Sequence, residues 1–153
     1  MVKTYGIISE LHKAPLHLVP LALHIVKQKE ANALILNGDV IGEQSGIHPK
    51  QYFATVLDHI GKSGLETYVL PGSHEPLLIF GPVLEHFTQQ YATMRDATKI
   101  QKVEKKDHTL VFIPGSDVHC GGQYHLGDEQ IPTGKYVHFN SRRLSFDHWN
   151  ECV

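Results

Sequence analysis

The chain has few cysteines, no long apolar run and little excess charge, and each of these shortages excludes a class of protein. Its two cysteines, Cys120 and Cys152, are too few and too far apart to indicate a disulfide framework. No stretch approaches the roughly 20 apolar residues that a membrane span requires. Residues 1–12 also lack the apolar core and the cleavage site of a signal peptide. We therefore expect a cytoplasmic protein that contacts no membrane.

Charge is close to balanced, with 14 lysines and arginines against 16 acidic residues and a net charge of −2. A protein that binds nucleic acid through its backbone phosphates carries a basic patch or stripe, and none is visible here. Hydrophobic residues make up 41% of the chain and charged residues 20%, which is typical of a folded globular domain. We expect a single domain over residues 1–153.

Short apolar runs alternate with longer segments of helical periodicity, which predicts an α/β fold with a mostly parallel sheet and helices on both of its faces. Pro20 lies within the first helical segment and either kinks it or belongs to its first turn. From Pro114 onward the pattern fades into a loop rich in glycine. The expected strands are 4–9, 33–36, 66–70, 100–103 and 109–113, and the expected helices are 15–30, 49–62 and 76–91.

Polar side chains follow each of the first three predicted strands at the point where the strand ends. Glu10 and His12 follow the first strand, Asp39 follows the second, and Ser73 and His74 follow the third. Ligands of open parallel sheets bind outside the carboxyl ends of the strands. The chain also has 12 histidines, the commonest metal ligand and the side chain that titrates near neutral pH. The sequence therefore predicts a metal or acid–base site at this edge.

Three segments carry a family resemblance. They read Glu-Leu-His at 10–12, Gly-Asp at 38–39 and Gly-Ser-His-Glu at 72–75. In this order and at this spacing they resemble the D-x-H, G-D and G-N-H-[DE] motifs of calcineurin-like metallophosphoesterases. The resemblance covers roughly the first half of the chain, where the strand signals lie. It implies a fold similar to the first half of that family's four-layer sandwich.

The resemblance also implies a role for each matching residue. Glu10 and His12 would bind one metal ion, Asp39 would bridge two, and Ser73 stands where the family has an asparagine ligand of the second ion. His74 matches the histidine that protonates the leaving oxygen or stabilises the phosphoryl transition state. The implied activity is hydrolysis of a phosphate mono- or diester, nucleotides included, by a metal-bound hydroxide, as in a metal-dependent phosphatase. The implied cofactors are two Mn, Fe or Zn ions. The residues that would bind the substrate are not indicated.

The sequence also departs from the family pattern. Glu10 replaces an aspartate and Ser73 replaces an asparagine, and the chain contains neither a Gly-His dipeptide nor an H-x-H element. The family completes its site with an isolated histidine and a G-H-x-H element, for which His119 and His125 are the only stand-ins we find. Three hypotheses therefore stay open, namely an amino-terminal piece of an enzyme, a short relative with one metal or none, and a sheet completed by a second copy or a missing second half. An inactive binding or scaffold module is the alternative function.

Each candidate site residue can also be interpreted as having a structural role alone, with no part in metal binding or catalysis. Asp39 would then be a turn residue, His12 a polar residue at the entry of a helix, and His74 a loop histidine before Pro76. Glu75 is interpreted as serving the first turn of the helix that follows it. These interpretations treat the residues one at a time, whereas the metal hypothesis requires the three strand ends to meet.

Overall fold

The computed structural model describes residues 4–12, 14–41, 46–72, 74–100 and 102–112, together with the backbone of 136–139 and 142–145. Its main sheet has four parallel strands in the order β1-β2-β3-β4, and one helix lies between each strand and the next in sequence. The α/β class and the mostly parallel sheet are therefore confirmed. The strands are β1 (Tyr5–Ile8), β2 (Ala33–Asn37), β3 (Glu66–Leu70) and β4 (Met94–Asp96).

Strand β4 is the one member of the main sheet that the sequence did not predict. It has only three residues, Met-Arg-Asp, which is too short a segment to display an alternating pattern. Its pairing with β3 defines it, with Thr67 opposite Met94 and Val69 opposite Asp96. Met94 is buried in the core on the side of the helices. Tertiary pairing, rather than local propensity, makes this segment a strand.

The three predicted helices are present and differ from the predictions by a few residues at their ends. They are α1 (Leu18–Gln28), α2 (Pro49–Ser63) and α3 (Leu77–Gln90). Pro20 lies in the first turn of α1, where its missing N–H would have had no helical partner. Helix α2 begins with Pro49 after the N-cap His48, whose Nδ1 accepts the Lys50 N–H. Its C-cap is Gly64, with φ 74°.

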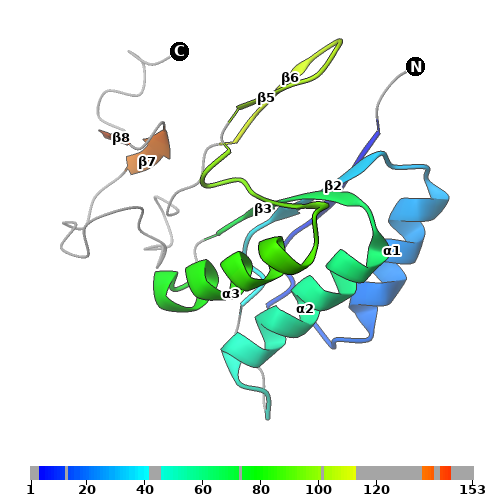
Figure 1. Ribbon diagram of the computed structural model, residues 1–153. Coiled ribbons are helices and arrows are strands. Elements are labelled where there is room, and N and C mark those ends of the chain that lie inside the picture. Colours follow the sequence, from blue (N-terminus) through cyan, green and yellow to red (C-terminus); the bar gives the residue numbers. More distant parts are fainter. Residues whose placement is uncertain are drawn as a thin grey trace.

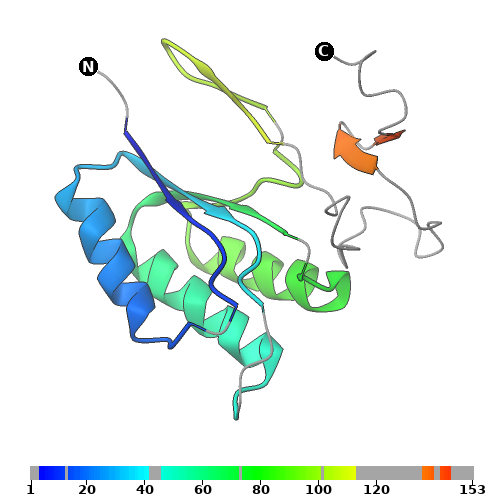
Figure 2. The ribbon, with the colours of Figure 1, turned by 180° about the vertical axis from the view of Figure 1, so that it is seen from behind.

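All three helices pack on one face of the sheet, so the expectation of helices on both faces is wrong (Figures 1 and 2). The strand order explains this arrangement. Crossovers between parallel strands are right-handed, and successive crossovers that advance in one direction place every helix on the same face. The main core therefore lies between sheet and helices, where Leu34, Leu36 and Val69 meet Phe53 and Phe80.

The opposite face of the sheet is covered in part by an antiparallel hairpin. Its strands are β5 (Lys102–Glu104) and β6 (Thr109–Val111), so both predicted strands form, but they pair with each other and not with the parallel sheet. A smaller core joins the hairpin to this face through Tyr68, Phe112 and Leu110. Figure 1 shows the hairpin on the side of the sheet away from the helices.

A second antiparallel pair is formed by β7 (Tyr136–Phe139) and β8 (Arg142–Ser145). Neither strand shows a periodic signal in the sequence. In the part of the chain that the structure describes, no helix combines the length and the apolar character that a membrane crossing requires.

Candidate metal centre

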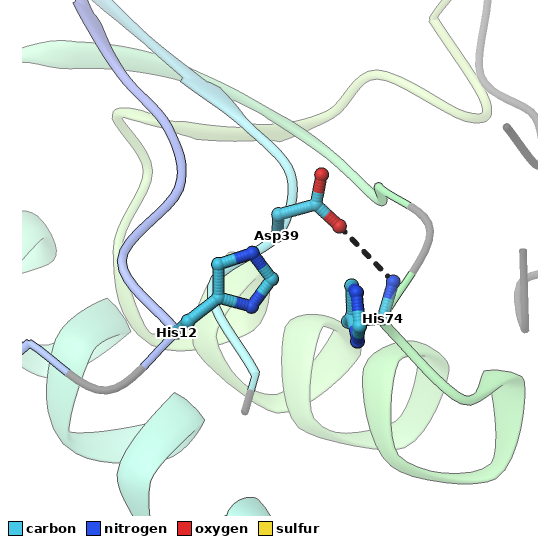
Figure 3. Close-up of side chains that lie close together, drawn as sticks. All are labelled: His12, Asp39 and His74. Atoms are coloured by element: carbon cyan, nitrogen blue, oxygen red, sulfur yellow. Dashed lines mark hydrogen bonds between the residues drawn. The ribbon is translucent and has the colours of Figure 1, made fainter. Parts of the chain in front are cut away.

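The loops that follow β1, β2 and β3 converge at the carboxyl edge of the sheet. His12 lies on the first loop, Asp39 on the second and His74 on the third. One potential ligand atom from each of these side chains lies within 4.8 Å of the other two. Figure 3 shows the three side chains, with the carboxylate of Asp39 beside both imidazole rings. The structure thus brings together three of the five residues that the sequence proposed.

Asp39 lies at the centre of this arrangement, because it accepts hydrogen bonds from both of the other loops. The backbone N–H of His12 donates to the carbonyl oxygen of Asp39 at 3.1 Å. The backbone N–H of His74 donates to Asp39 Oδ1, also at 3.1 Å. Since β2 lies between β1 and β3 in the sheet, its loop is the one that can contact both neighbours.

The backbone of the site is held in an unusual conformation. Glu10, His12 and Asp39 have φ angles of 57°, 28° and 51°, in the left-handed region that residues with a Cβ atom rarely adopt. Among the described residues other than glycine, only Glu30, two residues after the end of α1, shares this property. Strained residues of this kind cluster at functional sites, where the surrounding structure enforces them. Three of the four thus belong to the residues that the sequence singled out.

Two glycines allow the loops after β2 and β3 to touch. Gly38 has φ 66°, and a Cβ atom at this position would collide with the backbone of Gly72. A Cβ atom at Gly72 would lie 2.5 Å from the backbone nitrogen of Asp39 and 2.6 Å from its Oδ1. Both positions therefore require glycine for close approach. The contact places Asp39 against the loop that carries His74.

Glu10 lies next to this group but is not a member of it. Its Oε2 is 3.1 Å from His12 Nε2, and its side chain is 68% exposed. The structure therefore places Glu10 as a partner of the His12 ring. A carboxylate in this position can hold a histidine in the tautomer and orientation that suit metal binding.

Three other residues considered as ligands lie outside the described residues. They are Ser73, His119 and His125.

The sequence-based interpretation that Glu75 serves the first turn of the following helix is wrong. Helix α3 has Pro76 as its N-cap and no acidic side chain in its first turn. The Glu75 side chain points instead to the loop after β2, where it accepts the backbone N–H groups of Val40 and Ile41 at 2.7 and 2.9 Å.

The ligand set fits a divalent transition metal. Imidazole nitrogen suits Zn, Fe and related ions, and a carboxylate oxygen extends the range to Mn. Three protein ligands with further positions left for water or substrate are typical of catalytic metal sites. Among the described residues, His12, Asp39 and His74 form the only such group of three. These residues fit one ion, and the described part of the chain offers no comparable set for a second.

No protein-family model and no curated protein matches this chain. Among solved structures, it is similar to the protein TT1561 of Thermus thermophilus, with 16% sequence identity and a TM-score of 0.53. The match covers 62% of this chain and 41% of TT1561, so the likeness spans less than half of that protein. A second solved structure has 20% identity and a TM-score of 0.46 over 62% of this chain and 46% of its own, too low a score to support an argument. At these identities the similarity concerns the fold alone.

Proposed function

We propose that this chain belongs to a metal-dependent phosphoesterase of the calcineurin-like type. The observation that carries the proposal is the convergence of His12, Asp39 and His74, whose potential ligand atoms lie within 4.8 Å of one another. Each of the three residues lies on the loop after a different one of three consecutive parallel strands. Their order along the chain matches the motif order from which the family resemblance was drawn. The strained backbone at His12 and Asp39 supports a functional interpretation of the same loops.

His12 and Asp39 would hold the metal ion in this proposal. Asp39 Oδ1 already accepts the His74 N–H, but an ionised carboxylate has about four acceptor positions, so ligation remains open to it. The carboxylate of Glu10 would orient the His12 ring through the contact to Nε2. A bound divalent cation supplies charge neutralisation for the phosphate and lowers the pKa of water.

His74 would act on the substrate rather than as a ligand of the metal. Its side chain is exposed and lies beside Asp39, at the open side of the group. In hydrolysis the oxygen of a water molecule joins phosphorus while the ester P–O bond breaks. The leaving oxygen takes up one proton, and the attacking water gives one up to solvent. His74 would donate the proton or a hydrogen bond to the leaving oxygen, which is the usual role of a positioned imidazole.

The proposal also covers the number of metal ions and the class of substrate. The described residues support one divalent ion, and we keep two Mn, Fe or Zn ions as the composition of a complete site, with Ser73 and Glu10 as the further candidate ligands. The substrate class is a small phosphate monoester, phosphodiester or nucleotide.

A second candidate function is an inactive binding or scaffold module with the same fold. The observation that favours it is the position of Glu10, which contacts His12 and is not part of the three-residue group. A second chain, either another copy or a missing second half, would then cover the partly open face of the sheet, where Ile7 is 65% exposed.

Metal analysis combined with turnover tests separates the two functions. The purified chain is analysed for Mn, Fe and Zn, and it is then assayed with chromogenic phosphate mono- and diesters before and after Mn²⁺ is added. An enzyme contains or takes up stoichiometric metal and hydrolyses at least one ester. A protein that binds no metal and stays inert after Mn²⁺ addition contradicts the phosphoesterase proposal.

A further inference from the structure

Glu75 is an acidic residue that is buried, and nothing in the proposed chemistry uses it. Its exposed fraction is 0%, and it is the only acidic or basic residue among the buried residues that the structure describes. A buried carboxylate is costly unless hydrogen bonds replace the water that it loses. The environment of Glu75 is therefore informative about what the residue is for.

Four backbone N–H groups surround the Glu75 carboxylate. Oε1 accepts from Val40 and Ile41 at 2.7 and 2.9 Å, and Oε2 accepts from Asp39 and Gly72 at 2.9 and 2.5 Å. A carboxylate has about four acceptor positions, so its capacity is filled by these donors. Three of the donors belong to consecutive residues of the loop after β2, and the fourth belongs to the loop after β3.

These contacts act on the backbone of Asp39 itself. Asp39 has φ 51°, and its N–H is one of the four groups that Glu75 fixes. On the other side, the carbonyl and the carboxylate of Asp39 receive the N–H groups of His12 and His74. The Asp39 side chain can face both histidines only while its backbone keeps this conformation. Without Glu75, the N–H groups of Asp39, Val40 and Ile41 would be left without their present acceptor.

We propose that Glu75 is a positioning residue of the metal centre, whose carboxylate holds the loop after β2 so that Asp39 faces His12 and His74. In this role it would contact neither the metal ion nor the substrate. This role rests on the proposed metal function. It means that Glu75, the acidic residue after His74, stabilises the loop after β2 and not the first turn of α3.

Glu75→Gln tests the role because it changes the chemistry and keeps the shape. The amide keeps one oxygen acceptor, but its NH₂ group faces two backbone N–H donors and repels them. The matched control is Glu66→Gln, since Glu66 is partly buried at the start of β3 and accepts from Tyr68 Oη at 2.8 Å and from Lys105 Nζ at 3.2 Å. The control removes a carboxylate from the opposite end of β3 without touching the Asp39 loop.

Two quantities are measured on the parent and on both variants. Amide hydrogen exchange of Asp39, Val40, Ile41 and Gly72 is followed by NMR in the metal-free protein, and Mn²⁺ affinity is measured by calorimetry. In Glu75→Gln we expect faster exchange at these four amides and an Mn²⁺ affinity about 10- to 100-fold weaker. Glu66→Gln is expected to keep the parent values of both.

The possible failures are distinguishable from one another. A parent protein without Mn²⁺ affinity would overturn the metal function, and the positioning role with it. A parent that binds Mn²⁺ together with a Glu75→Gln variant that binds it equally well would overturn only the role of Glu75. If the variant does not fold, the parent supplies the test by itself. Zn²⁺, which is diamagnetic and leaves the NMR signals of nearby amides visible, should then slow exchange at all four amides together, and unchanged exchange at these sites would count against the proposal.

Discussion

The imidazole rings of His12 and His74 meet edge to face, with centroids 4.6 Å apart and an interplanar angle of 90°. They come from the loops after β1 and β3, which are not neighbours in the sheet. The strand between them is β2, and the loop after it carries Asp39, whose backbone and carboxylate contact both loops. The pairing of the two rings is therefore a consequence of strand order.

Asp39→Asn is expected to abolish specific metal binding and to leave the fold intact. The substitution removes the charge of the only carboxylate in the three-residue group and changes almost no volume. Mn²⁺ affinity by calorimetry measures the loss, and circular dichroism checks the fold. Asp96→Asn is the matched control, because Asp96 also lies at the carboxyl end of a parallel strand but its carboxylate accepts hydrogen bonds from nearby Thr98. Full metal content in Asp39→Asn would contradict the assignment.

His74→Gln is expected to lower kcat and to leave the metal affinity close to that of the parent. A positioned histidine that donates to the leaving oxygen contributes about 10²- to 10⁴-fold to a reaction rate. His12→Gln serves as the contrasting variant, and we expect it to weaken metal binding. Steady-state assays on a chromogenic ester and calorimetry together separate the two roles. If His74→Gln lost the metal as His12→Gln does, His74 would be a ligand instead.

Much of the fold could be predicted from local patterns. The apolar run of β2 and the helical spacing of α2 indicated both elements to within a residue. The strand endings also placed Asp39 and the two histidines at one edge, since parallel strands share their carboxyl side. These features depend on periodicity and chain direction, which the sequence displays directly.

Other features depend on contacts that no local pattern reveals. The single-sided placement of the helices follows from a strand order that never reverses, and strand order is a global property. Strand β4 exists because β3 offers it a pairing edge. The role of Glu75 depends on N–H groups 34 to 36 residues earlier in the chain. Local sequence rules predicted that this carboxylate interacts with the helix that follows it. In the structure it accepts hydrogen bonds from a loop that is distant in the sequence.

Gly72→Ala is expected to weaken metal binding because the new methyl group would overlap Asp39. Its Cβ would lie 2.5 Å from the Asp39 nitrogen and 2.6 Å from Oδ1, closer than real Cβ contacts allow. The control is Gly64→Ala at the end of α2, where φ is 74° and no heavy atom lies within 4 Å of the added Cβ. We expect the control to lose about 1 kcal/mol of stability from its backbone alone. A Gly72→Ala variant with the metal affinity of the control would contradict the close packing.

Mn²⁺ is expected to raise the melting temperature of the parent reversibly. A ligand that binds only the native state stabilises it by about 2.7 kcal/mol at 100 times its Kd. For a chain of this size, that corresponds to a rise in Tm of roughly 5 to 10 °C. Scanning calorimetry with Mn²⁺ and then with excess chelator measures the shift. Because the chain has 12 histidines that can bind metal weakly, Asp39→Asn is the necessary control, and an equal shift in that variant would indicate nonspecific binding.

Tyr91→Phe is expected to destabilise the protein in a pH-dependent way, remote from the metal centre. Tyr91 Oη donates to Asp58 Oδ1 at 2.7 Å and Lys62 Nζ donates to Oδ2 at 2.6 Å. Hydrogen bonds from Lys62 first, and then from Tyr91, hold the pKa of Asp58 below its ordinary value. A lowered carboxyl pKa stabilises the native state above the unfolded pKa of about 3.9, and this contribution is lost as the pH falls through the folded pKa.

Removing the Tyr91 hydroxyl raises the folded pKa of Asp58 toward the unfolded value. At pH 7 the variant should therefore have a lower free energy of unfolding than the parent, and the difference should shrink below about pH 4. Urea unfolding at about pH 7 and about pH 3, on either side of that unfolded pKa, measures both. Tyr52→Phe is the matched control, since Tyr52 Oη donates at 2.8 Å to the backbone carbonyl of Ala14, which does not titrate. Its cost should be the same at both pH values, and a pH-independent cost in Tyr91→Phe as well would show that the charge of Asp58 is not what the hydroxyl stabilises.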